Sequence, residues 1–224
     1  MDKLRFDKKY RKLFRNCPLF AGMEDGNLSA ALDLMGAGAA AYDKGEFLHF
    51  PYTPMERFGM ILSGVVEACM DDLEGSRMIM AEVTPGGTFG ESLCFLEVPE
   101  SPVYVFASEP TEVLWLSPKN LFVGSEDPFC MDLQRRFTAM LAARTLNMNK
   151  RIQVLSKIRL RDKIMTYFSQ IAQQTKSRTF QIPMNRNDLA AYLGVNRSAL
   201  SRELSMMKKE GLIDYYRDSI QILK

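Results

Sequence analysis

The spacing of apolar residues is most regular between residues 185 and 212, where two helical stripes lie on either side of Gly194. The stripes consist of Leu189, Ala190 and Leu193 before the glycine and of Ala199, Leu200, Leu204 and Met207 after it. An asparagine, which is a favoured N-cap, precedes each stripe at Asn185 and Asn196. Because glycine readily ends a helix, the pattern predicts two short helices joined by a tight turn.

The segments on either side complete a winged helix-turn-helix. Residues 158–171 place apolar and basic positions on opposite sides of a predicted helix, and residues 177–184 form a loop and short strand that lead to Asn185. Near the C-terminus, two short β-patterned runs surround a polar turn at residues 217–219, which is the pattern of a hairpin. We therefore expect residues 157–224 to form one domain.

The N-terminal half of the chain shows the pattern of β-strands in place of the helical spacing of the C-terminal half. From Ala40 to about Leu116, short β-patterned runs are separated by turns that often contain glycine. Strands of this length at regular intervals are typical of an antiparallel sandwich or barrel. A short helical segment between Phe14 and Leu34 precedes them. The expected fold class is therefore α+β, with an antiparallel β-roll or jelly-roll domain over residues 1–125.

Residues 126–156 connect the two domains. Asp127 and Pro128 start a predicted helix of about 28 residues with no internal proline or glycine. Its apolar positions follow a roughly heptad spacing that Arg144 interrupts. These positions are Phe137, Leu141, Met148, Ile152 and Leu155. The pattern favours dimerisation, in which the stripe is buried against a second copy of the chain; packing against the chain's own β domain is the alternative.

Charge is divided unevenly along the chain. Residues 151–224 hold 14 Lys and Arg against 6 Asp and Glu, whereas residues 1–150 hold 15 against 21. A basic domain favours polyanionic partners, because each phosphate contact releases condensed counterions. No apolar run approaches the ~18 residues that span a membrane, and the N-terminus has no signal-peptide core, so we expect a cytoplasmic protein with no membrane partner.

The polar face of the second helix carries residues that can read DNA. It presents Arg197, Ser198, Ser201 and Arg202. Arginine pairs bidentately with guanine, and serine hydrogen-bonds to a base or a phosphate, so double-stranded DNA is the expected partner. An ordinary helical hairpin with a solvated basic face is one alternative. A sequence-neutral architectural DNA binder is another, but it would depend on lysines and apolar wedges.

The order of these parts resembles the Crp/Fnr family of bacterial transcription regulators. The resemblance covers nearly the whole chain: it is most specific in LAAYLGVNRSALSREL and includes KGEFLHFPYTPMERFGMILSGVVEA and GGTFGES. It implies a homodimer in which an effector bound to the β-roll repositions the recognition helices on DNA. Activation in this family depends on surface loops that touch RNA polymerase, which is therefore a further expected partner of an activator.

The resemblance also implies which residues contact DNA. The four residues of the polar face are expected to face bases and phosphates, Arg186 is expected to approach the DNA backbone, and we add Asn196 to this set. Many family members have a glutamate, which reads cytosine, where Ser198 stands. The preferred operator therefore stays open.

The expected effector pocket departs from the pattern of the family's cyclic-nucleotide binders. In those proteins a Gly-Glu pair is followed ten residues later by Arg-Ser or Arg-Thr, which neutralises the cyclic phosphate. Here the expected pocket residues are Phe89, Gly90, Glu91, Ser92, Ser101 and Pro102. Serine and proline offer no cation, so a phosphodiester beside Glu91 would be poorly compensated. We expect a small, mostly apolar or aromatic effector; a cyclic-nucleotide-responsive regulator is the alternative.

Histidine and cysteine usage gives little sign of a metal or cofactor. The four cysteines include no CxxC pair, and His49 is the chain's single histidine, within an apolar run typical of a strand. Ordinary buried thiols and a strand histidine with satisfied hydrogen bonds are the interpretation that we favour over an iron-sulfur, haem or metal site. A metal-dependent β-barrel enzyme would need two or three histidines. We therefore predict no cofactor and no enzymatic activity.

Overall fold

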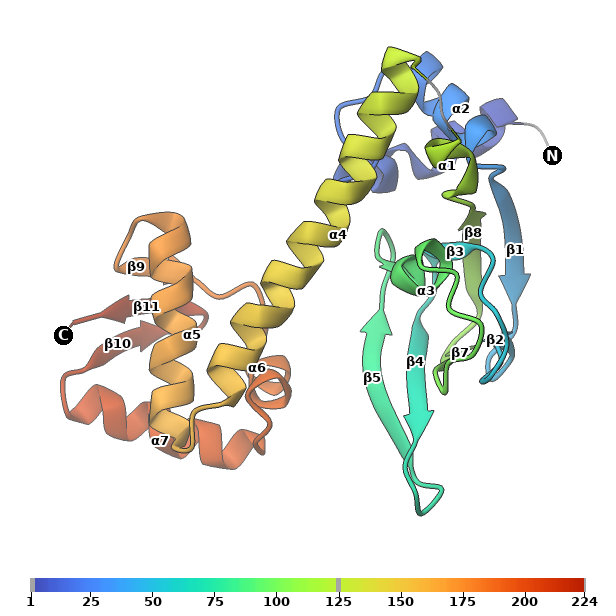
Figure 1. Ribbon diagram of the computed structural model, residues 1–224. Helices are drawn as coiled ribbons and strands as arrows, with labels where there is room; N and C mark the ends of the chain where they lie inside the picture. The colour runs from blue at the N-terminus through green and yellow to red at the C-terminus, as the bar shows by residue number, and fades with distance from the viewer. Residues whose placement is uncertain (1–2, 124–125, 224) are drawn as a thin grey trace. The chain divides into compact units, whose positions relative to one another are not determined.

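One long helix, α4 (Pro128–Leu155), is shared by the two compact units into which the chain divides, Met1–Ala142 and Ala143–Lys224. The computed structural model describes residues 3–123 and 126–223 (Figure 1). The helix has the 28 residues expected from its uninterrupted pattern. The predicted domain limit at residue 125 lies outside the described residues, and the division into units falls inside α4.

The first unit contains two four-stranded antiparallel sheets, which confirms the β-roll. One sheet has the strand order β1-β8-β3-β6 and the other β2-β7-β4-β5. The strands are β1 (Gly38–Tyr42), β2 (Phe47–His49), β3 (Phe58–Ser63), β4 (Val66–Asp71), β5 (Arg77–Val83), β6 (Thr88–Phe89), β7 (Tyr104–Ala107) and β8 (Thr111–Leu116). The segments with a β pattern in the sequence therefore form paired strands. Strand β1 lies at the edge of the first sheet.

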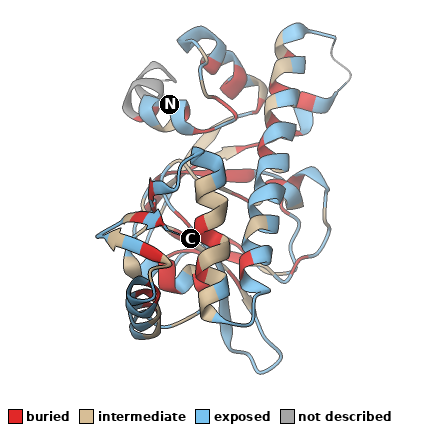
Figure 2. Ribbon diagram, turned by 90° about the vertical axis from the view of Figure 1, so that its left-hand side faces the viewer, coloured by how far each residue is buried: buried red, intermediate tan, exposed pale blue. Residues whose placement is uncertain are grey.

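Helices complete the core of this unit. They are α1 (Lys3–Asn16), α2 (Asp25–Leu34), α3 (Glu91–Phe95), the 3₁₀ helix η1 (Lys119–Phe122) and the first part of α4. Figure 2 shows the buried residues in red, on the strands and on parts of the helices. The ring of Phe137 in α4 lies 5.7 Å from that of Phe58 in β3 and 5.6 Å from that of Phe95 in α3. The start of α4 is thus built into the core of the β-roll.

The second unit is the predicted winged helix-turn-helix. It contains α5 (Leu160–Thr175), β9 (Thr179–Gln181), α6 (Arg186–Leu193), α7 (Arg197–Lys209), β10 (Ile213–Tyr216) and β11 (Ser219–Ile222). The strands form one antiparallel sheet in the order β10-β11-β9. Its core includes Phe168, Leu204, Met207 and Ile220 together with Val154 from the last turn of α4. The hairpin β10-β11 is the wing.

Local sequence signals fix the ends of the two central helices. The Asn185 side-chain oxygen accepts hydrogen bonds from the backbone N–H groups of Asn187 and Asp188, and that of Asn196 accepts one from Ala199. Both asparagines therefore satisfy N–H groups that a helix start leaves without partners. Gly194 ends α6 with φ = +67°, a left-handed conformation that glycine adopts without steric cost.

Across the described ranges, the search for a membrane-spanning helix gave a negative result: none combines the required length with the required apolar character.

Candidate nucleic-acid interface and effector region

The four residues predicted on the polar face of the recognition helix α7 lie together and are exposed. Arg197, Ser198, Ser201 and Arg202 occupy the first two turns of α7, whereas Leu200 and its neighbours on the other side are buried. This division follows from the 3.6-residue period, since the buried positions recur at intervals of three and four. The exposed face therefore offers two guanidinium groups and two hydroxyl groups to a ligand.

The first turn of this face is held by a local hydrogen-bond network. The Ser198 hydroxyl donates to the Asn196 side-chain oxygen at 2.8 Å, and the same oxygen accepts from the Ala199 N–H at 2.8 Å. The Asn196 oxygen is thus occupied by the helix cap. The side-chain amide NH₂ group is the part of Asn196 that can donate to a phosphate.

Arg161 of α5 forms hydrogen bonds to two glutamates of α7 and its C-terminal end. Its guanidinium donates to Glu203 at 2.8 Å and to both carboxylate oxygens of Glu210 at 2.7 and 2.9 Å. The hydrogen bonds to Glu210, followed by the one to Glu203, raise the pKa of Arg161. Glu203 lies within α7 and Glu210 is its C-cap residue, and the charge of both carboxylates is paired with Arg161. Sequence reasoning did not identify this contact, which joins residues more than 40 positions apart.

The structure places Arg186 against the wing. One guanidinium nitrogen, Nη2, donates to the backbone oxygen of Arg217 at 2.7 Å, and the guanidinium carbon lies 5.1 Å from the centre of the Tyr215 ring. The side chain is half-buried. Its predicted contact with the DNA backbone stays a prediction, but in the protein without DNA these groups are engaged by the wing.

The expected effector residues differ in their exposure. Phe89 is a core residue that packs edge-on against Trp115, with ring centres 5.5 Å apart. Ser92 and Pro102 are exposed. The buried polar groups among the expected six residues are Glu91 and Ser101. The family resemblance grouped these six residues, and their common role as a pocket stays a prediction.

Glu91 and Ser101 are both engaged within the protein. Glu91 follows Gly90, whose left-handed φ of +81° starts α3, and its carboxylate accepts a hydrogen bond from the Thr88 hydroxyl. The Ser101 hydroxyl oxygen accepts from the Val103 N–H at 3.3 Å. This geometry supplies a buried carboxylate and no cation from positions 101 and 102.

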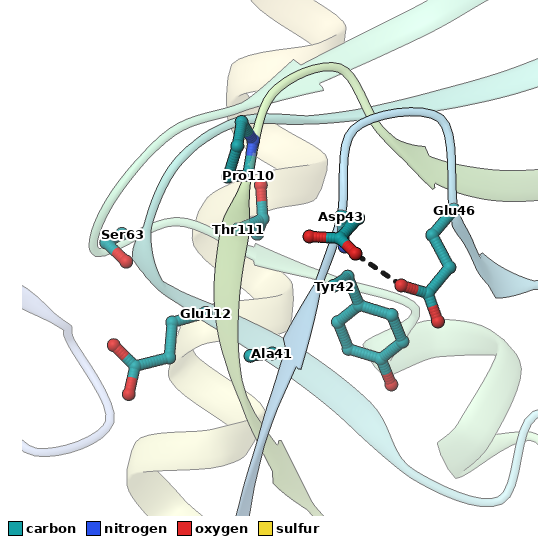
Figure 3. A pocket seen from close by; sticks show the side chains of 8 residues that line it. All are labelled: Ala41, Tyr42, Asp43, Glu46, Ser63, Pro110, Thr111 and Glu112. Atoms are coloured by element: carbon teal, nitrogen blue, oxygen red, sulfur yellow. Dashed lines mark hydrogen bonds between the residues drawn. The ribbon is translucent and has the colours of Figure 1, made fainter.

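A cavity of about 400 Å³ lies elsewhere in the β-roll, at the ends of β1, β3 and β8 (Figure 3). It is lined by Ala41, Tyr42, Asp43, Glu46, Ser63, Pro110, Thr111 and Glu112. The Asp43 N–H donates to the Glu46 carboxylate at 2.9 Å, as drawn in Figure 3. Three carboxyl groups line the space, so it suits an anion poorly. None of the six expected effector residues contributes to it.

Comparison with known proteins agrees with both units. Residues 158–224 match the model of the Crp-like helix-turn-helix domain, and residues 40–122 match that of the cyclic nucleotide-binding domain. The cAMP-activated global transcriptional regulator CRP of Pasteurella multocida is 23% identical over 167 residues, which cover 72% of this chain and 78% of that protein. The cyclic AMP receptor protein of Thermus thermophilus is 25% identical over 200 residues, 89% of each chain.

The chain belongs to the Crp/Fnr family of transcription regulators. The fold of this Crp/Fnr protein is also that of the solved structure of DNR from Pseudomonas aeruginosa, with a TM-score of 0.52 and 21% identity over 96% of this chain and 93% of that one. DNA binding through the helix-turn-helix follows from family membership.

The apolar stripe of α4 in this Crp/Fnr protein is divided between two environments. Phe137 is fully buried and Leu141 is partly buried against the β-roll core, whereas Met148 and Ile152 are 62% and 60% exposed. The prediction that Phe137 belongs to an exposed dimer seam therefore needs correction, because its ring packs among Phe58, Phe95 and others of its own unit. The exposed part of the stripe lies in the second half of α4.

The thiols and the histidine are core residues. All four cysteines are buried and unpaired, and burial raises the pKa of Cys94 to about 11. The Cys94 thiol therefore stays protonated and reacts slowly. Burial also lowers the pKa of His49. Within the described ranges, no three His, Cys, Asp or Glu side chains gather in a metal-binding arrangement.

Proposed function

We propose that this Crp/Fnr regulator is a homodimer that recognises a two-fold related DNA operator through α7 and responds to an effector other than cyclic AMP or cyclic GMP. The exposed face of α7 carries the proposal. Arg202 and Arg197 are assigned to base edges and phosphates, with Ser198 and Ser201 beside them. Asn196 is assigned to a phosphate at the start of the helix.

Dimerisation is proposed because the second half of α4 leaves the large apolar side chains of Leu146, Met148, Ile152 and Leu155 exposed. Met148 and Ile152 are four residues apart, so they share one side of the helix. A two-fold dimer matches DNA half-sites about one helical turn apart, which a monomer cannot engage together. RNA polymerase is proposed as a further partner on family grounds, for the case in which the regulator activates.

The operator proposal is tested by selecting sites for the full-length protein from a random DNA library. We expect an inverted repeat to be enriched, and the selected site to bind roughly 10³-fold or more tightly than random DNA at physiological salt. A sequence-neutral architectural binder would enrich no motif and show no such ratio. Enrichment of a single half-site without a repeat would argue against the dimeric mode.

The effector proposal depends on the charge around Glu91. The two relatives are named for cyclic AMP, but here Ser101 and Pro102 stand where cyclic-nucleotide binders have an arginine and a hydroxyl residue. Glu91 is 2% exposed. A phosphodiester placed beside this carboxylate would lose its hydration and meet a like charge without compensation. An apolar or aromatic small molecule would avoid that cost.

We therefore expect isothermal titration with cyclic AMP or cyclic GMP to show no binding at micromolar concentrations. The cAMP-activated regulator of Pasteurella multocida, titrated in the same buffer, is the positive control. Micromolar or tighter binding by this protein would contradict the proposal. It would mean that a cation outside positions 101 and 102 neutralises the phosphate.

A further inference from the structure

The aromatic ring of Tyr215, in the first strand of the wing, is held by two cations from different elements. The guanidinium carbon of Arg186, at the start of α6, and the ammonium nitrogen of Lys208, near the end of α7, each lie 5.1 Å from its centre. Lys208 also forms an ion pair with Asp214 at 2.5 Å and donates to the backbone oxygen of Tyr215 at 3.3 Å. The wing is therefore fixed to both helices of the helix-turn-helix.

Arg186 also contacts the tip of the wing. Its Nη2 group donates to the backbone oxygen of Arg217, which lies in the turn between β10 and β11 with φ = +51°. Its Nη1 group is buried and has no hydrogen-bond partner among the residues that the structure describes. A phosphate cannot reach a buried nitrogen in this conformation, so the contacts of Arg186 fit a structural attachment better than a direct DNA contact.

The attached tip presents an arginine on an aromatic ring. Tyr216 is 73% exposed, and the guanidinium carbon of Arg217 lies 5.5 Å from the centre of its ring. Stacking restricts the Arg217 side chain before any ligand arrives, so less conformational entropy is lost on binding. An arginine on a narrow hairpin tip matches the narrow minor groove of A·T-rich DNA, where the negative potential is strongest.

We propose that Arg186 is a positioning residue that locks the wing, and that Arg217, stacked on Tyr216, enters the minor groove flanking each half-site and gives preference for A·T-rich flanks. This inference rests on the proposed function, because it needs an operator bound by α7. It adds specificity at positions that α7 does not contact.

The first experiment compares flanks. The operator selected from the random library is prepared with A-tract flanks and with G·C flanks, and the full-length protein is titrated with each at fixed salt. We expect the A-tract form to bind roughly 5-fold or more tightly, as for one specific arginine contact, and Arg217→Ala to abolish this preference. Arg178→Ala removes the same charge from an exposed position before β9, and we expect it to retain the preference.

The second experiment is a double-mutant cycle of Arg186→Met and Arg217→Ala. If Arg186 acts through the wing, Arg186→Met removes the flank preference in the parent protein and causes no further loss in the Arg217→Ala background. If Arg186 contacts a phosphate directly, the Arg186→Met substitution weakens DNA binding equally in both backgrounds and with both flanks. That result would show that the proposal is wrong. Tyr215→Leu, which removes the ring, should act like Arg186→Met, whereas Tyr215→Phe keeps the ring and should restore the preference.

Folding and function are separated by two further measurements. Each variant is checked by thermal unfolding and by binding to the G·C-flanked operator, which still tests α7. Arg217→Ala alters an exposed tip, so it decides the flank preference even where Arg186→Met unfolds. Equal binding of wild-type protein to both flanks would overturn the minor-groove assignment. Failure to select any operator would instead overturn the proposed function itself.

Discussion

A protein in which Met148 and Ile152 are both replaced by aspartate is expected to be monomeric and to bind its operator about 10²- to 10⁴-fold more weakly. The lost factor is the gain from engaging two half-sites at once, since the second helix then binds as part of the same molecule. Both side chains are exposed in the single chain, so the aspartates meet water there and do not disturb the core. In a dimer the same positions would bury unpaired carboxylates.

Leu146 provides a matched control for this double variant. It is 61% exposed, but it stands two residues before Met148 and therefore lies roughly 160° away around the helix. Leu146→Asp should stay dimeric and keep its operator affinity. Mass is measured by light scattering and affinity by titration with the selected operator. A Met148→Asp, Ile152→Asp protein that remains dimeric would place the interface on another surface, as would a Leu146→Asp protein that becomes monomeric.

The same helix shows what hydrophobic spacing can and cannot predict. The absence of proline and glycine after Pro128 predicted the full length of α4, because helix formation depends on local sequence. The spacing also predicted that Phe137 and Met148 would share a stripe. It could not predict which neighbour covers each position, and the β-roll covers Phe137. That information comes from tertiary contacts with Phe58 and Phe95, far away in the sequence.

The helix-turn-helix was predictable because its signals are local. Asn185, Asn196 and Gly194 each act within a few residues, as N-caps or as a left-handed turn. Strand β1 had no comparable signal over its whole length. Its sequence, GAAAY, lacks alternation of large apolar and polar residues, and it forms a strand because it pairs with β8, for example Gly38 with Trp115.

Features that combine distant segments were the least predictable part. The cavity in Figure 3 combines residues from the ends of β1, β3 and β8, so no single segment of the sequence predicts it. The attachment of Arg186 to Tyr215 was missed for a similar reason, since 29 positions separate the two residues. Contacts of this kind depend on how the elements pack, which periodicity and capping do not specify.

Replacing Arg202 by alanine is expected to remove about 1–3 kcal/mol of discrimination between the operator and random DNA, roughly 5- to 150-fold in the affinity ratio. Arg202 is exposed on α7, and within the described part of the chain its side chain makes no hydrogen bond or ion pair to another residue. The variant should therefore fold with a free energy of unfolding within about 0.5 kcal/mol of wild type. The loss should appear in binding to the operator and much less in binding to random DNA.

Lys209→Ala is the control for the loss of one positive charge from the same helix. Lys209 lies in the last turn of α7, whereas the N-terminal part of a recognition helix reaches the base edges. If Lys209 contacts a phosphate, the Lys209→Ala substitution should weaken binding to operator and to random DNA alike. The slope of log K against log salt should then fall by about one in magnitude. The measurement is a pair of titrations, with operator and with random DNA, at several salt concentrations. An equal loss on both DNAs in the Arg202→Ala protein would show that Arg202 contacts the backbone, and direct base readout would have to be reassigned to Arg197.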